Sequence, residues 1–396
     1  MAKGKRELSS KGKRKKRQPL ALSILEYIVA VLVIFAAICL LRSLLGVEDS
    51  SETDSEELVG QEAGEDSGLV LSETETSEGE ESEEEEAAET EESEPVTITI
   101  SAVGDCTLGT DEYFDQTSSL PAYAEQYGLS YFFSNVSDIF EADDLTIVNF
   151  EGVLTTSTSR ADKTYAFKGD PSYTEILTSG GVEACNLANN HSHDYGEESY
   201  TDTVTYLEEA GLITFGYDSV AVTEINGVKV GLVGIYELAE LEDCADDLEA
   251  CMEEVQEQGA ELIIVSFHWG TEKATEPDEV QISLAHQAVD LGADLVIGHH
   301  PHVLQGIEEY NGVNIVYSLG NFCFGGNSNP SDKDTMIYQQ TFTIIDGEVQ
   351  QDLDVNIIPC SVSSSSSYND YCPTPATGDE AERILEKIQE RSDAIG

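Results

Sequence analysis

Basic residues are scarce in this sequence beyond residue 42. The 396 residues carry a formal net charge of −59, and only nine lysines and arginines follow Arg42. Nucleic-acid binding requires a basic surface that neutralises backbone phosphates, so the composition excludes DNA and RNA as partners of this part of the chain. An anionic ligand would need local help from metal ions or from the cations of one short segment, Arg160, Lys163 and Lys168.

Cysteine motifs are also lacking, because none of the eight cysteines belongs to a Cys-x-x-Cys pair. Nothing therefore indicates a zinc ribbon. Cys360 and Cys372 flank a serine-rich loop and could form one disulfide, and Cys244 and Cys251 could form another; spacing alone decides neither pairing. Three others lie in or beside apolar runs and are expected to be buried thiols: Cys106, Cys185 and Cys323.

A basic head and one long apolar stretch occupy the N-terminal part of the chain. Residues 1–19 are rich in lysine and arginine, and residues 20–42 are almost wholly apolar up to Arg42. About 22 apolar residues can span a hydrocarbon core of about 30 Å, and no small-residue cleavage site follows. We predict a single-pass anchor in the cell membrane, with the basic head in the cytoplasm and the main domain extracytoplasmic. A cleaved signal peptide is the alternative.

The next segment, residues 43–95, is dominated by glutamate, serine and threonine. Between residues 48 and 94 it contains no lysine or arginine and few large apolar side chains. Such a segment cannot bury a core, and its like charges repel one another. We predict a disordered, extended linker between the anchor and a folded domain.

Alternating strand and helix patterns begin near Val96 and predict one α/β domain over residues 96–360. Several apolar runs are continuous, as expected of strands covered on both faces, and Asn226-Gly227 and Asp346-Gly347 predict hairpins. The main expected strands are 96–103, 145–150, 182–187, 213–215, 229–235, 262–267, 295–297 and 313–319, and the main expected helices are 197–210, 241–258 and 277–291. Residues 361–396 are expected to form a serine-rich loop and a C-terminal helix.

Five of these strands end in residues that can bind a metal ion, and six of the seven histidines lie at such ends. Ligands collect at the carboxyl ends of strands in α/β proteins. The strand-end residues are Asp105, Glu151, Asn190 with His191, His268, and His300 with His302. The last two flank Pro301, which stiffens their loop.

Carboxylates and imidazoles without thiolates favour Zn, Mn or Fe over a structural zinc site. A carboxylate can bridge two cations, and a pair about 3.5–4 Å apart is the usual arrangement for phosphoester hydrolysis. The pattern therefore predicts a site for two divalent metal ions, or for one. The alternative is a set of hydrogen-bonded loop residues without a metal. His286, in the middle of a predicted helix, is expected to be structural.

Six motifs in a fixed order resemble the CapA family of poly-γ-glutamate capsule synthesis proteins. They are GDCTLG (104–109), NFEG (149–152), NNHSHDYG (189–196), HWGTE (268–272), GHHPHVLQG (298–306) and YSLGNF (317–322). That family resembles calcineurin-like metallophosphoesterases, so the resemblance implies a β-sandwich of mixed sheets flanked by helices. It also implies a role in capsule synthesis, export or anchoring, with capsule synthase subunits or an anionic polymer as partners.

The resemblance implies a role for each motif residue. Asp105 and His302 would hold one metal, Asn190, His268 and His300 would hold the other, and Glu151 would bridge them. His191 would be the general acid. Five further residues are expected around the site as second-layer or substrate contacts: His193, Asp194, Trp269, Glu272 and Asn321. Trp269 could equally pack in the core, and His299 should face away from His300.

Two positions depart from the phosphoesterase pattern. Thr107 stands where those enzymes carry a histidine ligand, and the bridging position holds Glu151 in place of aspartate. The first metal would have one ligand fewer. Two other functions therefore stay open beside the capsule role: a metal-dependent phosphoesterase acting at the cell envelope, and a non-catalytic binding module that uses a degenerate metal site.

Overall fold

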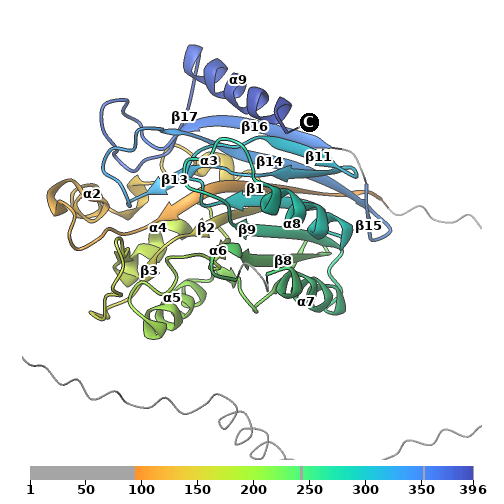
Figure 1. The fold of residues 1–396 in the computed structure, drawn as a ribbon, viewed down its shortest axis with the longest axis horizontal. Helices are drawn as coiled ribbons and strands as arrows, with labels where there is room; N and C mark the ends of the chain where they lie inside the picture. The colour runs from red at the N-terminus through yellow and green to blue at the C-terminus, as the bar shows by residue number, and fades with distance from the viewer. Residues whose placement is uncertain (1–93, 241–243, 351–352, 396) are drawn as a thin grey trace, which may run out of the picture. The chain divides into compact units, whose positions relative to one another are not determined.

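The computed structural model describes residues 94–395 apart from 241–243 and 351–352 (Figure 1). The predicted basic head, membrane anchor and all but the last two residues of the predicted linker lie outside the described residues. Within the described ranges, no helix is both long enough and apolar enough to cross a membrane.

Two mixed sheets form the centre of the domain. The first follows the order β17 (Thr374–Pro375), β16 (Asp354–Ser361), β14 (Asp334–Ile345), β1 (Val96–Thr107), β2 (Leu145–Phe150), β5 (Ala184–Asn186) and β6 (Ile213–Phe215), with β13 (Asn321–Phe324) beside β1 and β15 (Glu348–Val349) beside β14. The second follows the order β11 (Ile307–Tyr310), β12 (Val313–Val316), β10 (Leu295–His299), β9 (Leu262–His268), β8 (Val228–Tyr236) and β7 (Ala221–Ile225). A short pair, β3 (Val153–Leu154) and β4 (Lys168–Gly169), stands apart.

Helices flank both sheets (Figure 1). They are α2 (Leu120–Tyr127), α3 (Ser137–Phe140), α4 (Thr174–Thr178), α5 (Glu197–Glu209), α6 (Glu237–Glu240), α7 (Cys244–Glu257), α8 (Glu279–Asp290) and α9 (Asp379–Asp393). Three apolar clusters fill the resulting layers. One lies between the sheets, one joins the first sheet to α3, α4 and α5, and one joins the second sheet to α7 and α8.

The period of two along each strand explains this layering. In β9, Leu262 and Ile264 face the other sheet, whereas Ile263 and Val265 face the helices. A strand with apolar residues on both faces must be covered on both sides. The predicted fold class, a mixed α/β sandwich flanked by helices, is confirmed for the described residues.

The C-terminal helix α9 is held by charge pairs to the strand β14. Arg383 donates to both carboxylate oxygens of Asp334, and Lys387 also pairs with Asp334. Further along α9, Arg391 donates to the carbonyl of Leu304, and the Ile307 N–H donates to the Ser392 hydroxyl at 2.8 Å. The helix is therefore fastened to the segment that follows the histidine motif.

Element boundaries differ from the predictions at a few places. The expected helix 241–258 is described over Cys244–Glu257, and residues 241–243 lie outside the described residues. The expected strand 313–319 stops at Val316, because Tyr317 and Leu319 leave the ladder and bond the carbonyls of Gly306 and Gly298. The predicted turn at Asp346-Gly347 joins β14 to the two-residue strand β15 before the chain reaches β16.

Neither candidate disulfide is formed. Cys360 and Cys372 are free thiols that face different surroundings: Cys360 contacts the carbonyl of Ile358, and Cys372 contacts that of Tyr131. Cys251 is likewise a free thiol, and it donates to the carbonyl of Tyr217. Burial raises the pKa of Cys360 to about 12, which disfavours the reactive thiolate.

Two carboxyl groups at the start of β2 are expected to make stability depend on pH. Burial raises the pKa of Asp143 to about 6 and that of Glu183 to about 7, and one oxygen of Asp143 is buried without a partner. A carboxyl group whose pKa is higher in the folded state than in the unfolded state contributes stability at a pH below its unfolded-state pKa. That contribution is lost as the pH rises through its folded-state pKa.

We therefore expect the free energy of unfolding to fall by about 1 kcal/mol as pH rises from about 5 to about 8, and Asp143→Asn to remove part of this loss. Urea unfolding at both pH values measures it. Asp162→Asn, at an exposed position, is the control. Equal pH dependence in wild type and Asp143→Asn would contradict the assignment.

Candidate functional site

The strand-end residues converge where the carboxyl ends of strands from both sheets meet. Asp105 lies near the end of β1 and Glu151 directly follows β2, both in the first sheet. His268 ends β9, and His300 directly follows the neighbouring strand β10 of the second sheet. Because β1 runs parallel to β2, and β9 to β10, each pair of residues leaves its sheet on the same side.

The loop after β10 has an unusual backbone. His300 and His302 have φ values of 94° and 57°, a region that side chains other than glycine rarely occupy. Each such residue costs on the order of 1–3 kcal/mol, and such strain clusters at functional sites. The carbonyl of Pro301 between them accepts from the Lys273 N–H at 2.7 Å. With this backbone, the loop predicted from the proline places both imidazoles beside Glu151.

A close backbone approach fixes the position of Asp105. A Cβ on Gly104 would lie 2.1 Å from the carbonyl oxygen of Gly320, so only glycine fits. The Asp105 N–H donates to that same carbonyl at 3.0 Å, and Asp105 pairs in register with Asn321 of β13. This contact brings the first and the sixth of the six sequence motifs side by side.

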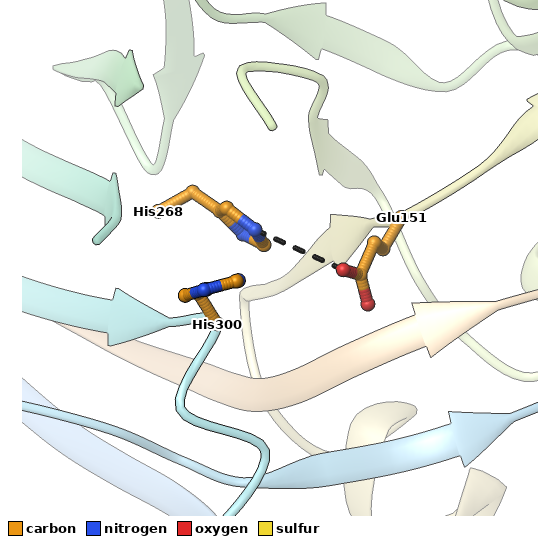
Figure 2. Close-up of side chains that lie close together, drawn as sticks. All are labelled: Glu151, His268 and His300. Carbon is orange, nitrogen blue, oxygen red and sulfur yellow. Dashed lines mark ion pairs between the residues drawn. The ribbon is translucent and has the colours of Figure 1, made fainter. Parts of the chain in front are cut away.

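The structure gathers the carboxylates and histidines in two groups of three that share Glu151. Glu151, His268 and His300 form one group (Figure 2), and Asp105, Glu151 and His302 form the other. Within each group, one ligand atom from each residue lies within 4.8 Å of the others. The side chain of Asn190 joins the first group, since its Oδ1 lies 2.9 Å from Nε2 of His268.

Several polar atoms at the centre of the cluster have no protein partner. Oε1 of Glu151 and Nδ1 of His300 are buried and accept or donate no hydrogen bond. Oε1 of Glu151 lies 3.8 Å from Nε2 of His268 and 3.9 Å from Nε2 of both His191 and His302. These distances are too long for hydrogen bonds. For the two candidate ligands, His268 and His302, they suit atoms that each lie about 2 Å from a cation shared with Glu151. The residues present therefore fit divalent metal ions.

Burial dominates the electrostatics of the first group. It raises the pKa of Glu151 to about 8, lowers that of His300 to about 4 and lowers that of His268 well below its usual range. Both imidazoles are thus neutral, which is the form that binds a cation. A buried carboxyl group without a partner is unfavourable on its own, and a cation would relieve that cost.

The second group contains an ion pair. Nδ1 of His302 lies 3.0 Å from Asp105 and 2.9 Å from Oδ1 of Asn321. Burial opposes both charges, but the hydrogen bond and charge of His302 outweigh it and hold the pKa of Asp105 below its usual range. The charges of Glu151 and Asp105 likewise outweigh burial and raise the pKa of His302 to about 10.

A linked trio places His191 at the edge of the cluster. Its Nδ1 lies 2.7 Å from Asp194, which also accepts from Lys163 at 2.6 Å. The Phe167 ring lies against the imidazole, with centroids 4.4 Å apart. Burial lowers the pKa of His191, although Asp194 acts in the opposite direction. Asp194, expected as a second-layer residue, thus orients His191 and contacts no other member of the cluster.

Asn149 is the residue that the sequence patterns missed. Its Nδ2 donates to Asp105 at 2.8 Å and lies 3.2 Å from Nδ1 of His268, and its Oδ1 accepts from Asn186 and Asn189. One buried amide therefore links the two groups of candidate ligands. The available signal was a polar residue inside the apolar run of β2, two positions before Glu151.

Other predicted residues lie elsewhere. Trp269 is fully buried, stacks on Phe267 and donates to the Tyr317 carbonyl, so it packs in the core and cannot contact a substrate. His193 lies on the surface beside Glu197 and Tyr200, outside the cluster.

The remaining expectations concern two histidines and one glutamate. His299 faces the backbone carbonyls of Val103 and Phe267, away from His300, as expected. His286 contacts Glu308 and stacks on Tyr310, consistent with a structural role. Glu272 is exposed and lines a cavity beside His302.

Comparisons with known proteins match the region that holds the six motifs. Residues 99–326, more than half of the chain, match the family model described as Bacterial capsule synthesis protein PGA_cap. The PGA biosynthesis protein CapA of Bacillus subtilis (strain 168) is 32% identical over 248 residues, which are 57% of this chain and 63% of that protein. The Capsule biosynthesis protein CapA of Bacillus anthracis is 29% identical over 253 residues, 57% of this chain and 60% of that protein.

The matched region thus spans less than two thirds of either relative's length. Among solved structures, the 5'-nucleotidase from Candida albicans SC5314 aligns with a TM-score of 0.40 at 11% identity, covering 75% of this chain and 57% of that one. A likeness this weak carries no argument about function. The family model rests on the same region that holds the six motifs, and the chain belongs to the PGA_cap family of bacterial capsule synthesis proteins.

Proposed function

We propose that this protein takes part in poly-γ-glutamate capsule synthesis, export or anchoring. We also propose that its folded domain contains a two-cation centre that can hydrolyse a phosphoester. The observation that carries the proposed chemistry is the position of Glu151. This buried carboxylate belongs to both groups of candidate ligands, and its Oε1 has no hydrogen-bond partner in the protein. A shared carboxylate is the arrangement that holds two cations at the short separation used in phosphoryl transfer.

Each side chain would contribute a separate part of the chemistry. Asp105 and His302 would hold one cation, and Asn190, His268 and His300 the other. A pair of divalent cations supplies Lewis acidity to phosphoryl oxygens and an activated water. As the imidazolium, His191 would hold the proton for the leaving group at Nε2, and Asp194, 2.7 Å from Nδ1, would stabilise that charged form.

The capsule role is supported by the family and by the names of two relatives. The Bacillus subtilis protein is described as a PGA biosynthesis protein and the Bacillus anthracis protein as a capsule biosynthesis protein. We place the domain outside the membrane, anchored through residues 20–42, with capsule synthase subunits as partners. Protease added to intact cells should remove the domain, and a fully protected domain would reject this orientation. Direct binding of polyglutamate is disfavoured by the net charge of −59.

A non-catalytic binding module is the second candidate, and Thr107 favours it. Thr107 occupies the expected position of a histidine ligand, and its hydroxyl contacts Glu151 at 3.5 Å. The group around Asp105 therefore offers fewer ligands than the group around His268. A site with one retained cation could serve structure or binding without turnover.

Turnover of generic phosphoesters separates the two candidates. The full-length protein, stripped with chelator and reloaded with Mn²⁺, is expected to hydrolyse a phosphomonoester or a phosphodiester. His191→Ala should lower kcat by about 10²–10³-fold, in the range of general acid catalysis. His286→Ala, at a histidine outside the cluster, is the matched control.

Absence of turnover in wild-type protein that retains bound Mn²⁺ would favour the binding module. Equal kcat in wild type and His191→Ala, with turnover present, would reject His191 as the acid while leaving hydrolysis intact.

A further inference from the structure

A cavity of about 470 Å³ opens beside the cluster, and its walls include His191 and His302. It is the natural place for the part of a ligand that does not contact the cations. Its volume is in the range of small-molecule pockets. The chemistry of its walls therefore bears on what the site accepts.

Four aromatic rings form one side of this cavity: Phe114, Tyr165, Phe167 and Phe324. Tyr165 and Phe167 are parallel within 6° with centroids 6.4 Å apart, and Phe114 meets Tyr165 edge-on at 5.8 Å. Tyr165 is 51% exposed, so its ring is available to a ligand.

The rings continue inward to the cluster. Phe167 contacts the His191 ring at 4.4 Å, and Phe324 lies 5.3 Å from the His302 ring. Gly326 keeps this wall flat, because a Cβ there would lie 2.7 Å from Phe324 and 2.9 Å from Phe167. An aromatic surface thus runs from the exposed Tyr165 to His191 and His302 at the edge of the cluster.

One lysine, Lys273, lines the same cavity, together with three acidic residues, Asp115, Glu272 and Asp332. Among the described residues, Lys273 is the single basic side chain with no hydrogen bond or ion pair, whereas Lys163 and Arg160 are paired with Asp194 and Asp111. Its backbone is fixed by the bond from its N–H to Pro301, between His300 and His302. An unpaired ammonium group held at this place suits an anionic ligand.

We infer that the ligand of this site is an anionic phosphoester that carries a planar ring, with the ring stacked on the Tyr165 side of the aromatic wall and Lys273 paired with its negative charge. Stacking on aromatic faces gains about 0.5–1.5 kcal/mol beyond burial of area. A simple alkyl ester would gain only the burial. The inference rests on the proposed function, because it takes the cation centre as the position where the phosphoryl group binds. It does not require that the ester is hydrolysed.

Binding of non-hydrolysable phosphonates tests the inference without catalysis. Calorimetry on the full-length, Mn²⁺-loaded protein compares phenylphosphonate, hexylphosphonate and methylphosphonate. We expect phenylphosphonate to bind about tenfold tighter than methylphosphonate and tighter than hexylphosphonate. Tyr165→Ala and Phe114→Ala should each reduce the preference for phenylphosphonate over methylphosphonate several-fold. Lys273→Gln should lower the affinities for phenylphosphonate and methylphosphonate by the same factor.

Two variants serve as controls. Tyr113→Ala removes a neighbouring tyrosine that is 75% exposed but does not line the cavity, and Lys229→Gln removes a lysine remote from it. Both should leave the phenyl preference unchanged.

Equal affinity for phenyl and methyl probes, equal affinity for phenyl and hexyl probes, or no binding of any probe to Mn²⁺-loaded protein would each overturn the inference. A phenyl preference without hydrolysis of any ester would reject catalysis and retain the ligand class. Hydrolysis without a ring preference would do the reverse.

Discussion

Glu151→Gln is expected to abolish binding of both divalent cations and, at the same time, to make the metal-free protein more stable. Glutamine keeps the size of the side chain but removes the charge. Because Glu151 belongs to both groups of candidate ligands, its loss should empty both positions. The double variant His268→Ala, His300→Ala removes ligands of one group only and should lose one cation. Metal content per protein chain, measured after dialysis against Mn²⁺, distinguishes these outcomes.

The gain in stability has a separate cause. Glu151 is fully buried and its Oε1 has no hydrogen-bond partner. Among the described residues, its side chain accepts one hydrogen bond, a long one of 3.5 Å from Thr107. A buried carboxyl group without good partners destabilises the folded state. In the presence of chelator, Glu151→Gln should therefore raise the free energy of unfolding by about 1–3 kcal/mol.

Glu237→Gln is the matched control for this prediction. Glu237 is also buried but lies outside the cluster, where it accepts from the Gly270 N–H at 3.2 Å. It should leave metal content unchanged. A Glu151→Gln protein that still binds two cations, or that is less stable than wild type in chelator, would reject the shared role of this carboxylate.

Gly298→Ala is expected to destabilise the protein by about 3 kcal/mol and to disturb the histidine loop. A Cβ at this position would lie 2.1 Å from the Tyr317 carbonyl oxygen and 2.5 Å from Nε1 of Trp269. These two atoms are hydrogen-bonded to each other at 2.9 Å. Strand β10 could accept the methyl group only by moving away from the chain at the end of β12. His300 lies two residues after Gly298, so this movement would displace its imidazole.

Urea unfolding and metal content together measure this effect. Gly128→Ala is the control, because Gly128 has φ 84° but no atom within 4 Å of the added Cβ. Its cost should be limited to the left-handed backbone, about 1 kcal/mol. If the two variants lose the same stability, the close packing at Gly298 is not what restricts that position.

The strand ends were predictable because strong local patterns mark them. Continuous apolar runs that stop at Asp105, Glu151 and His268 identify buried strands and the polar residues that follow, and parallel pairing then brings those residues together. The same patterns predicted an α/β domain whose strands are covered on both faces, whereas the sandwich was implied by the family resemblance. The position of each residue at its strand end depends on residues that are close to it in the sequence. These predictions therefore needed little knowledge of tertiary structure.

Residues whose role depends on distant partners were not predictable in this way. Asn149 is one polar position within an apolar strand, and nothing local shows that it reaches both Asp105 and His268. Trp269 follows His268 directly, yet strand alternation turns it to the opposite face, into the core. The aromatic wall combines Phe114 and Tyr165, from two loops whose conformations no periodic pattern encodes, with Phe324 at the end of β13.

The attachment of α9 has a consequence for the order in which the site is completed during synthesis. The chain segment after His302 is held by Arg391 and Ser392, which leave the ribosome almost ninety residues later. Asp334 also receives its cationic partners only from this helix. A nascent chain that already contains every candidate ligand therefore still lacks the contacts that α9 makes with the segment after His302. The site is fully supported only after α9 has left the ribosome and packed against the domain.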